Sequence, residues 1–275
     1  MSAKAGKKRS SPGADVAKNG DPFADVDIGE EDEKKLVEVQ NAILRVELIL
    51  ERRAQETLIP VYQKRREAVK TIPKFWPVAL LKHSIVSFHA QHDADKLALS
   101  HLEDLWIVRD AREPKVFTLE FYFKENPYFS DSVLKKEYRF EPSNASANEQ
   151  ADADGITPSM LDFSWDRDVT AQATKINWKD ESKNLCKLYP LVLDEEDADQ
   201  VADPGSFFNF FEVARDYNDL GVTIANEIFP DAIQYFKGDI GDELYSDEEE
   251  DSDTDGEDAE EIDLEKPRAK KAKNA

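Results

Sequence analysis

Apolar residues recur at helical spacing between about residues 30 and 71, a stretch that contains no glycine. Their separations alternate between three and four positions and then shift through a four-residue stutter, as in a coiled-coil stripe. The residues of this stripe are Leu36, Val39, Ile43, Val46, Leu50, Leu58 and Val61. We therefore predict one long helix over residues 30–72, which Pro60 is expected to kink or break.

Such a helix would be about 60 Å long, at about 1.5 Å per residue. It could pack on its own domain or against the same helix of a second copy. The charged residues beside the stripe are mixed in sign, as on a solvated face. Because a helix of this length overhangs a domain of this size, the pattern favours a homodimer paired along the stripe.

The next segments change from helical to alternating periodicity. Residues 78–90 and 93–105 are predicted to form two short amphipathic helices. Residues 105–111, 116–123 and 134–140 alternate apolar and polar positions, which is typical of half-buried strands. Since turn-forming residues separate these strands, we predict an antiparallel meander.

The second half of the chain returns to helices after a long connection. We expect residues 142–174 to be a partly disordered hairpin connection with a short strand near Phe163–Trp165, followed by a strand over 175–179. Ser206 is a plausible N-cap for a helix over 207–216, and Asp219 for another that reaches Phe229. A last helical turn is expected over 231–236. The order of helix, sheet and helix predicts an α+β fold.

Charge changes the picture most strongly at the C-terminal end. Residues 239–265 carry 16 Asp and Glu with no Lys or Arg, and residues 21–238 contribute a further −16 to the net charge of −23. A run of this kind cannot bury itself and is expected to stay disordered. Because phosphate contacts need Lys and Arg, nucleic acid is an unlikely direct ligand. The composition therefore points to a basic protein as the partner.

The two ends of the chain are basic. Residues 1–29 resemble a disordered basic arm, and a second basic cluster lies between Lys266 and Lys273. Either cluster could serve as a nuclear import signal, which predicts a nuclear protein and leaves shuttling with the cytoplasm open. Ser246, Ser252 and Thr254 precede acidic residues and are candidate phosphorylation sites, where each phosphate would add about −1.5 to −2 charges.

Catalytic and metal-binding patterns are weak. His83, His89, His92 and His101 lie close together in the sequence without an arrangement typical of a metal site, and Cys186 stands alone. The chain contains no glycine-rich phosphate loop and no nucleophile elbow. No apolar stretch approaches the length of about 18 residues that a membrane span needs. We predict a non-enzyme without cofactor or metal, and without a membrane partner.

Several short strings together resemble the nucleosome assembly protein family, in its SET subgroup. They occur in the family's order, between about residues 30 and 265, and the acidic tail follows them. The strings are Tyr62–Glu67, Ile72–Trp76, Phe121–Phe129, Val133–Glu137, Lys175–Lys179, Ser206–Phe211, Glu227–Pro230 and Gln234–Phe236. Aromatic strings usually mark a core, so their order and the tail carry the resemblance. The connection after Ser143 looks enlarged relative to the family.

The resemblance implies a homodimer with antiparallel pairing of the 30–72 helices, an earmuff-like α+β domain over 73–238 that binds histones on a concave acidic surface, and an acidic tail over 239–275. It implies a histone chaperone that shields core histones and delivers them to DNA. An acidic nuclear scaffold or enzyme inhibitor, for example of a phosphatase, is the alternative. The implied histone contacts are Asn209, Glu212, Asn218, Asp219 and, in the tail, Asp247, Glu248, Glu249, Glu250 and Asp251.

Overall fold

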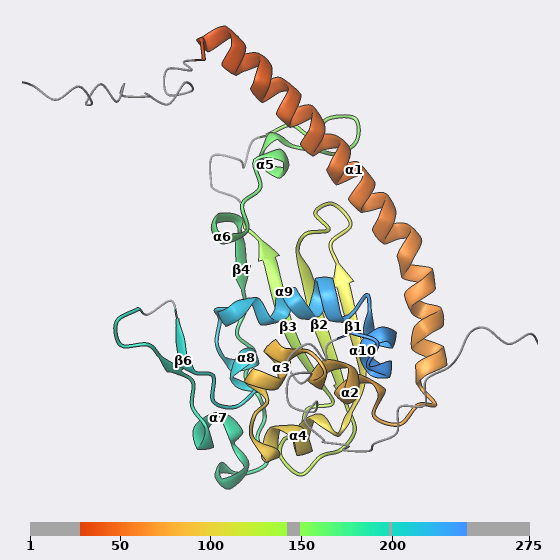
Figure 1. Cartoon of the computed structure of the whole chain (residues 1–275), viewed down its shortest axis with the longest axis vertical. Coiled ribbons are helices and arrows are strands. Elements are labelled where there is room, and N and C mark those ends of the chain that lie inside the picture. Colours follow the sequence, from red (N-terminus) through yellow and green to blue (C-terminus); the bar gives the residue numbers. More distant parts are fainter. Residues whose placement is uncertain (1–27, 142–148, 198–199, 241–275) are drawn as a thin grey trace, which may run out of the picture.

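A single long helix stands beside the folded body. The computed structural model describes residues 28–141, 149–197 and 200–240. Helix α1, Glu30–Val69, runs without interruption through Pro60, so the predicted break is wrong, although the ribbon curves along its length (Figure 1). Proline removes one hydrogen bond from the helical ladder. Arg52 and Arg65 anchor the helix on the two sides of Pro60 through hydrogen bonds to the carbonyl oxygens of Asp154 and Pro230.

Three short helices connect α1 to the sheet. They are α2, Phe75–Leu81; α3, Ser84–His89; and α4, Asp93–Leu99. The helix expected over 78–90 is therefore two helices, and the one expected over 93–105 ends early. Phe75 and Trp76 are buried at the junction with α1, where Lys74 adopts a left-handed conformation with φ of 57°. The chain turns at Lys74, and the two rings enter the core.

The central sheet is an antiparallel meander, as predicted. Its strands lie in the order β1-β2-β3-β4, and a separate two-stranded ribbon pairs β5 with β6. The strands are β1, Leu102–Arg109; β2, Phe117–Phe123; β3, Val133–Phe140; β4, Val169–Ala171; β5, Val192–Leu193; and β6, Val201–Asp203. The predicted α+β fold class is confirmed.

The connection after β3 differs from its prediction. The strand expected at Phe163–Trp165 is wrong: helices α5, Pro158–Leu161, and α6, Trp165–Asp168, occupy this part of the chain. Phe163 packs against Phe140 and Trp165 against Phe117, and both contacts bring the connection back to the sheet. The strand expected over 175–179 is reduced to one bridge, between Phe129 and Trp178.

One of the three helices predicted near the C-terminal end is shorter than expected, and the other two agree with the structure. The helices of the second half are η2, Glu181–Lys183; α7, Leu185–Leu188; α8, Asn209–Glu212; η3, Tyr217–Asp219; α9, Leu220–Thr223; the π-helical turn η4, Ile224–Ile228; and α10, Ala232–Lys237. The helix expected over 207–216 is limited to α8 because Val213 is extended, with φ of −97° and ψ of 136°. Asp219 is the N-cap of α9, as predicted, although its side chain makes no capping hydrogen bond.

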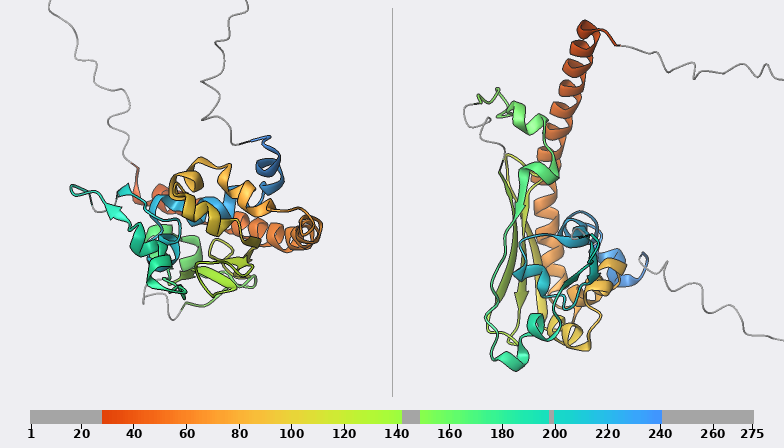
Figure 2. Two further views of the ribbon diagram at one scale, coloured as in Figure 1. Left: turned by 90° about the horizontal axis from the view of Figure 1, so that it is seen from below. Right: turned by 90° about the vertical axis from the view of Figure 1, so that its left-hand side faces the viewer.

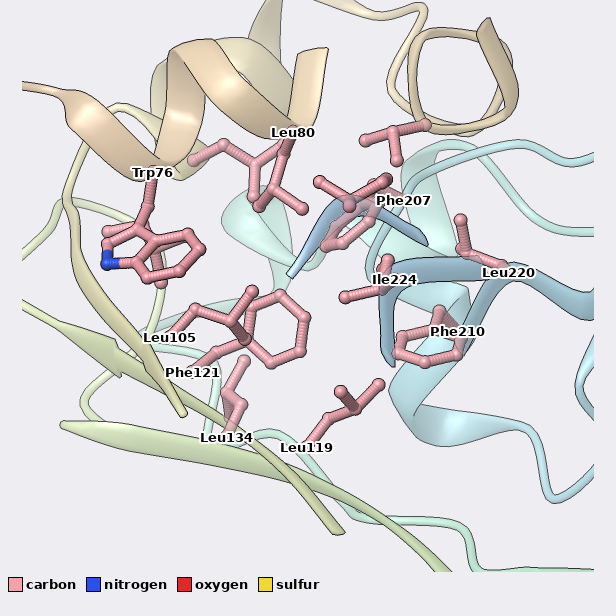
Figure 3. Close-up of a cluster of buried hydrophobic side chains, with 14 of the residues drawn as sticks. Trp76, Leu80, Leu105, Leu119, Phe121, Leu134, Phe207, Phe210, Leu220 and Ile224 are labelled. Atoms are coloured by element: carbon pink, nitrogen blue, oxygen red, sulfur yellow. The ribbon is translucent and has the colours of Figure 1, made fainter. Parts of the chain in front are cut away.

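The helices cover one face of the sheet and leave the other open (Figure 2). Phe117, Leu119 and Phe121 point from β2 toward the helices, and the residues between them are only partly buried. Figure 3 shows Trp76 from α2 above Phe121, with Phe207 and Ile224 beside them. This alternation makes a core on one side of the sheet and a polar surface on the other. Among the helices of the described ranges, none has the length and apolar content that crossing a bilayer requires.

Candidate functional site

Helix α1 presents two faces of different character. Leu36, Val39, Ile43, Val46 and Leu50 are 46 to 62% exposed, whereas Leu48 on the other side is only 1% exposed. Val61 is also exposed and Leu58 is half-buried. The stripe thus points away from the domain that carries it, which excludes its packing on that domain within the described chain. Apolar side chains at this density on one helix face require a partner surface.

The opposite face of α1 is held by the connection after β3. Arg45 pairs with Asp152 at 2.8 Å and also with Asp154. Arg52 donates hydrogen bonds to the carbonyl oxygens of Arg112, at 2.8 Å, and of Asp154, at 2.7 Å. One arginine therefore joins α1 to two loops. The prediction from sequence missed this role, although the seven-residue spacing of Arg45 and Arg52, off the apolar stripe, is a signal of a second contact face.

The C-terminal end of α1 is fixed to the core by another arginine. The Arg65 guanidinium lies 4.7 Å from the ring centre of Tyr62 and 4.3 Å from that of Phe229, and it donates to the carbonyl oxygens of Phe229 and Pro230. Burial lowers the pKa of Arg65 to about 10. These contacts set the direction in which α1 leaves the domain.

The second feature of interest is the segment from the end of α8 into the first residues of α9, Val213–Gly221, which includes η3 and which we call the 213–221 loop. Two of its residues, Asn218 and Asp219, have left-handed conformations with φ of 60° and 53°, and both are exposed. Such backbone positions cost on the order of 1–3 kcal/mol each and concentrate at functional sites. The Asn218 side chain interacts with His89, whose pKa burial lowers to about 4. The loop thus presents the Asp219 carboxylate in a fixed, strained backbone.

The other two predicted contacts point into the fold. Asn209 is buried and donates from its side chain to the carbonyl oxygens of Tyr189, at 2.9 Å, and Pro204, at 3.2 Å. Glu212 accepts hydrogen bonds at one carboxylate oxygen from the Trp178 indole, at 2.9 Å, and from the Ile176 backbone, at 3.3 Å. The structure therefore separates the four residues into an inward pair and an exposed pair.

The remaining predicted sites lie outside the described residues. They are Ser246, Asp247, Glu248, Glu249, Glu250, Asp251, Ser252 and Thr254 in the tail, together with residues 1–27 of the basic arm and the C-terminal basic cluster.

The open face of the sheet is hollowed but carries balanced charges. Two adjoining hollows, of about 700 and 530 Å³, share Val108, Thr118 and Glu137 in their linings. On this face Lys135 pairs with Glu120 at 2.6 Å, and Arg139 pairs with Glu137 at 2.8 Å. Burial opposes ionisation of Glu120, but hydrogen bonds from Lys135 and Tyr122 lower its pKa, and the hydrogen bond from Arg139 lowers the pKa of Glu137. The carboxylates on these strands are therefore largely neutralised, and the strands themselves are not the acidic part of the body.

His83 and His92 make contacts typical of structural residues. The His83 ring accepts a hydrogen bond from the Ile85 backbone at the start of α3, and His92 stacks on Tyr189 with ring centres 3.9 Å apart. Burial raises the pKa of Cys186, which favours the neutral thiol over a reactive thiolate. Within the described ranges, no group of three or more His, Cys, Asp or Glu side chains could hold a metal ion.

Comparison with known proteins agrees with this geometry. Residues 23–239 match the model of the family described as nucleosome assembly protein. The chain is 30% identical over 226 residues to nucleosome assembly protein 1;2 of Oryza sativa subsp. indica, covering 74% of this chain and 56% of that protein. It is 28% identical over 186 residues to Protein SET of Drosophila melanogaster, covering 64% and 60%. In structure it resembles nucleosome assembly protein 1 from Plasmodium knowlesi, with a TM-score of 0.51 and 26% identity over 78% of this chain and all of that one.

The fold and the site define an α+β domain carried on a long helix whose free face is apolar. The chain belongs to the nucleosome assembly protein family, since the family match covers most of its length. It is also similar to SET proteins, as the relative from Drosophila melanogaster shows. It spans little more than half the length of these two curated relatives.

Proposed function

We propose that this protein is a histone chaperone that works as a homodimer in the nucleus. The observation that carries the proposal is the family match over residues 23–239, because this range contains both the exposed stripe of α1 and the 213–221 loop. Residues 30–72 would form the dimer by antiparallel pairing, and residues 73–238 would bind histones. The tail, residues 239–275, would assist histone binding. The partners are core histones.

The proposed mechanism is electrostatic shielding. Residues 21–238 and 239–265 each contribute −16 to the net charge, so the folded body and the tail both attract basic proteins. Histones collapse onto DNA without order when their basic surfaces are free, and an acidic partner masks those surfaces. DNA then recovers the histones because its charge density is high and its wrapped geometry matches them.

Within the body, we assign direct histone contact to Asn218 and Asp219. Both side chains are exposed in the 213–221 loop, and the left-handed backbone conformation at both positions sets the direction of their side chains. Asn209 and Glu212 would support the site indirectly, since their hydrogen bonds fix α8 to the neighbouring segments. In the tail, the run from Asp247 to Asp251 would speed association by attracting basic partners at long range, and phosphates on Ser246, Ser252 and Thr254 would strengthen that attraction.

An assembly assay tests the proposed function. Purified core histones, plasmid DNA and topoisomerase are mixed at physiological salt with and without the protein, and supercoiling reports nucleosome formation. We expect the protein to keep histones soluble and to increase supercoiling. If it did neither, the chaperone proposal would fail and the acidic-scaffold alternative would remain.

A separate titration measures how much the folded body and the tail each contribute to histone binding. A variant that ends at residue 240 should still bind histones, with lower affinity and slower association than the full chain, because the tail contributes long-range attraction. Titrations at several salt concentrations are required, since the affinities of highly charged partners depend strongly on salt. Complete loss of binding in the shortened variant would contradict a role for the body.

A further inference from the structure

Strand β3 carries a lysine that is fully buried. Lys136 has 0% exposure, and its side chain points to the helical face of the sheet, where its ammonium group lies 5.2 Å from the ring centre of Phe210. The ammonium donates a hydrogen bond to the backbone oxygen of Val213, the first residue of the 213–221 loop. A buried lysine is rare because its charge loses its hydration. A position that retains one calls for an explanation beyond packing.

The same strand supplies a second polar side chain to the same loop. Tyr138 lies two residues after Lys136, so both point to one face of the sheet. The Tyr138 hydroxyl donates to Asp216 at 2.6 Å, and that carboxylate also accepts from the Gly221 backbone at 3.0 Å. Tyr138 and Asp216 therefore fix the middle of the 213–221 loop and its end, whereas Lys136 fixes its beginning.

We infer that Lys136 and Tyr138 are positioning residues that hold Asn218 and Asp219 in their left-handed conformations for histone binding. This inference rests on the proposed function. Asn218 and Asp219 lie in the short turn η3, whose regular backbone does not include left-handed residues. We therefore assign the restraint on their conformation to the contacts that β3 makes with the loop. The contacts at Val213, Asp216 and Gly221 bracket the strained pair in sequence.

The test uses two substitutions with matched controls on the opposite face of the sheet. Lys136→Met and Tyr138→Phe each remove one hydrogen bond to the loop and keep the side-chain volume. Lys135→Met and Tyr122→Phe remove the same chemical groups from neighbouring positions, where the native side chains contact Glu120 instead. The full-length chain carries each change, and circular dichroism verifies folding. Lys136→Met leaves the Val213 oxygen without its donor, so some loss of stability is expected, and Tyr138→Phe tests the same inference independently if Lys136→Met does not fold.

Histone affinity is then measured in a double-mutant cycle with Asp219→Asn. In the wild type we expect Asp219→Asn to weaken binding of core histones by about two- to fivefold, which is the range for one exposed charge. In the Lys136→Met and Tyr138→Phe backgrounds, Asp219→Asn should cause almost no further loss of affinity, because a displaced Asp219 already contributes little to histone binding. In the two control backgrounds the loss should persist. An equal loss in all backgrounds would overturn the inference.

Hydrogen exchange gives a second readout that does not depend on histones. Amides of the 213–221 loop, above all that of Gly221, should exchange faster in Lys136→Met and Tyr138→Phe than in the controls. Unchanged exchange would overturn the inference, whatever the histone affinities of the variants. If the wild type bound no histones, the proposed function itself would fail, and the exchange rates would still decide whether the two side chains hold the loop.

Discussion

A β-carbon at Gly221 would overlap the hydroxyl oxygen of Tyr138 and lie 2.7 Å from its Cζ atom. Tyr138 is almost completely buried and bonded to Asp216, so the ring cannot move aside. Phe210 limits the same space, with its Cζ atom 3.1 Å from that β-carbon position. Glycine is therefore required at this position by the side chain of Tyr138, which lies directly against it, and not by the backbone conformation.

Gly221→Ala should lower the free energy of unfolding by about 1–3 kcal/mol, the usual cost of overpacking. In a Tyr138→Phe background the added cost should be smaller, because the overlapping oxygen is gone. Urea denaturation of the wild type, the two single variants and the double variant measures the coupling between the two positions. Strictly additive effects would show that the hydroxyl does not cause the conflict.

The buried ammonium of Lys136 predicts a pH dependence of stability. Burial lowers its pKa to about 8, from an ordinary value of 10.5. Between these values the unfolded chain binds more protons than the folded chain, so the free energy of unfolding should rise with pH through this window. The rise should approach roughly 3 kcal/mol by pH 10.5.

Comparison of variants isolates the Lys136 contribution from other titrations. As the pH rises from 7.5 to 10, the wild type should gain unfolding free energy relative to Lys136→Met. Lys135→Met should show no such shift, because Lys135 is exposed and its pKa is raised by Glu120. A pH-independent difference for Lys136→Met would contradict the prediction.

The exposed stripe on α1 predicts the oligomeric state. Ile43→Asp combined with Leu50→Asp should convert a dimer into a monomer, because acidic side chains cannot be buried in an apolar helix pair. The domain should stay folded, since both residues are exposed in the single chain. Leu97→Asp on α4, where Leu97 is also exposed, is the control and should leave the mass unchanged. Sedimentation velocity measures the result, and persistence of the dimer in the double variant would exclude the stripe as the interface.

The contacts of Arg52 predict that the connection after β3 is protected from proteolysis. Arg52→Ala removes the hydrogen bonds to Arg112 and Asp154, so residues 149–161 should become more accessible to protease. Arg53→Ala is a suitable control because Arg53 is exposed and pairs only with Glu56 within the described contacts. Mass spectrometry of limited digests locates the cleavage sites. Equal cleavage in both variants would show that Arg52 does not hold the connection.

Periodicity predicted the long helix and the meander because each has a repeat of its own in the sequence. Pro60 does not break α1, and Arg52 and Arg65 hold the helix on either side of it. The strand expected at Phe163–Trp165 failed because a run this short has no repeat of its own: Phe163 packs on Phe140 before α6, and Trp165 starts α6 and packs on Phe117.

The candidate site was less accessible to prediction. Asn209, Glu212, Asn218 and Asp219 are near neighbours in the sequence, yet only the last two are exposed. The inward direction of Asn209 depends on Tyr189, 20 residues away, and that of Glu212 depends on Trp178, 34 residues away. Sequence position places a polar residue in a segment, but hydrogen bonds from other segments decide whether it faces solvent.

The sequence by itself determined the α+β class, the long helix with its apolar stripe and the acidity of body and tail, because periodicity and charge are properties of neighbouring residues. Only the tertiary structure decided that the stripe faces away from its own domain, that Arg52 joins two loops to α1, and that Lys136 and Tyr138 lie beneath the 213–221 loop. These relationships join residues far apart in the chain, and packing fixes them only when the whole domain has folded.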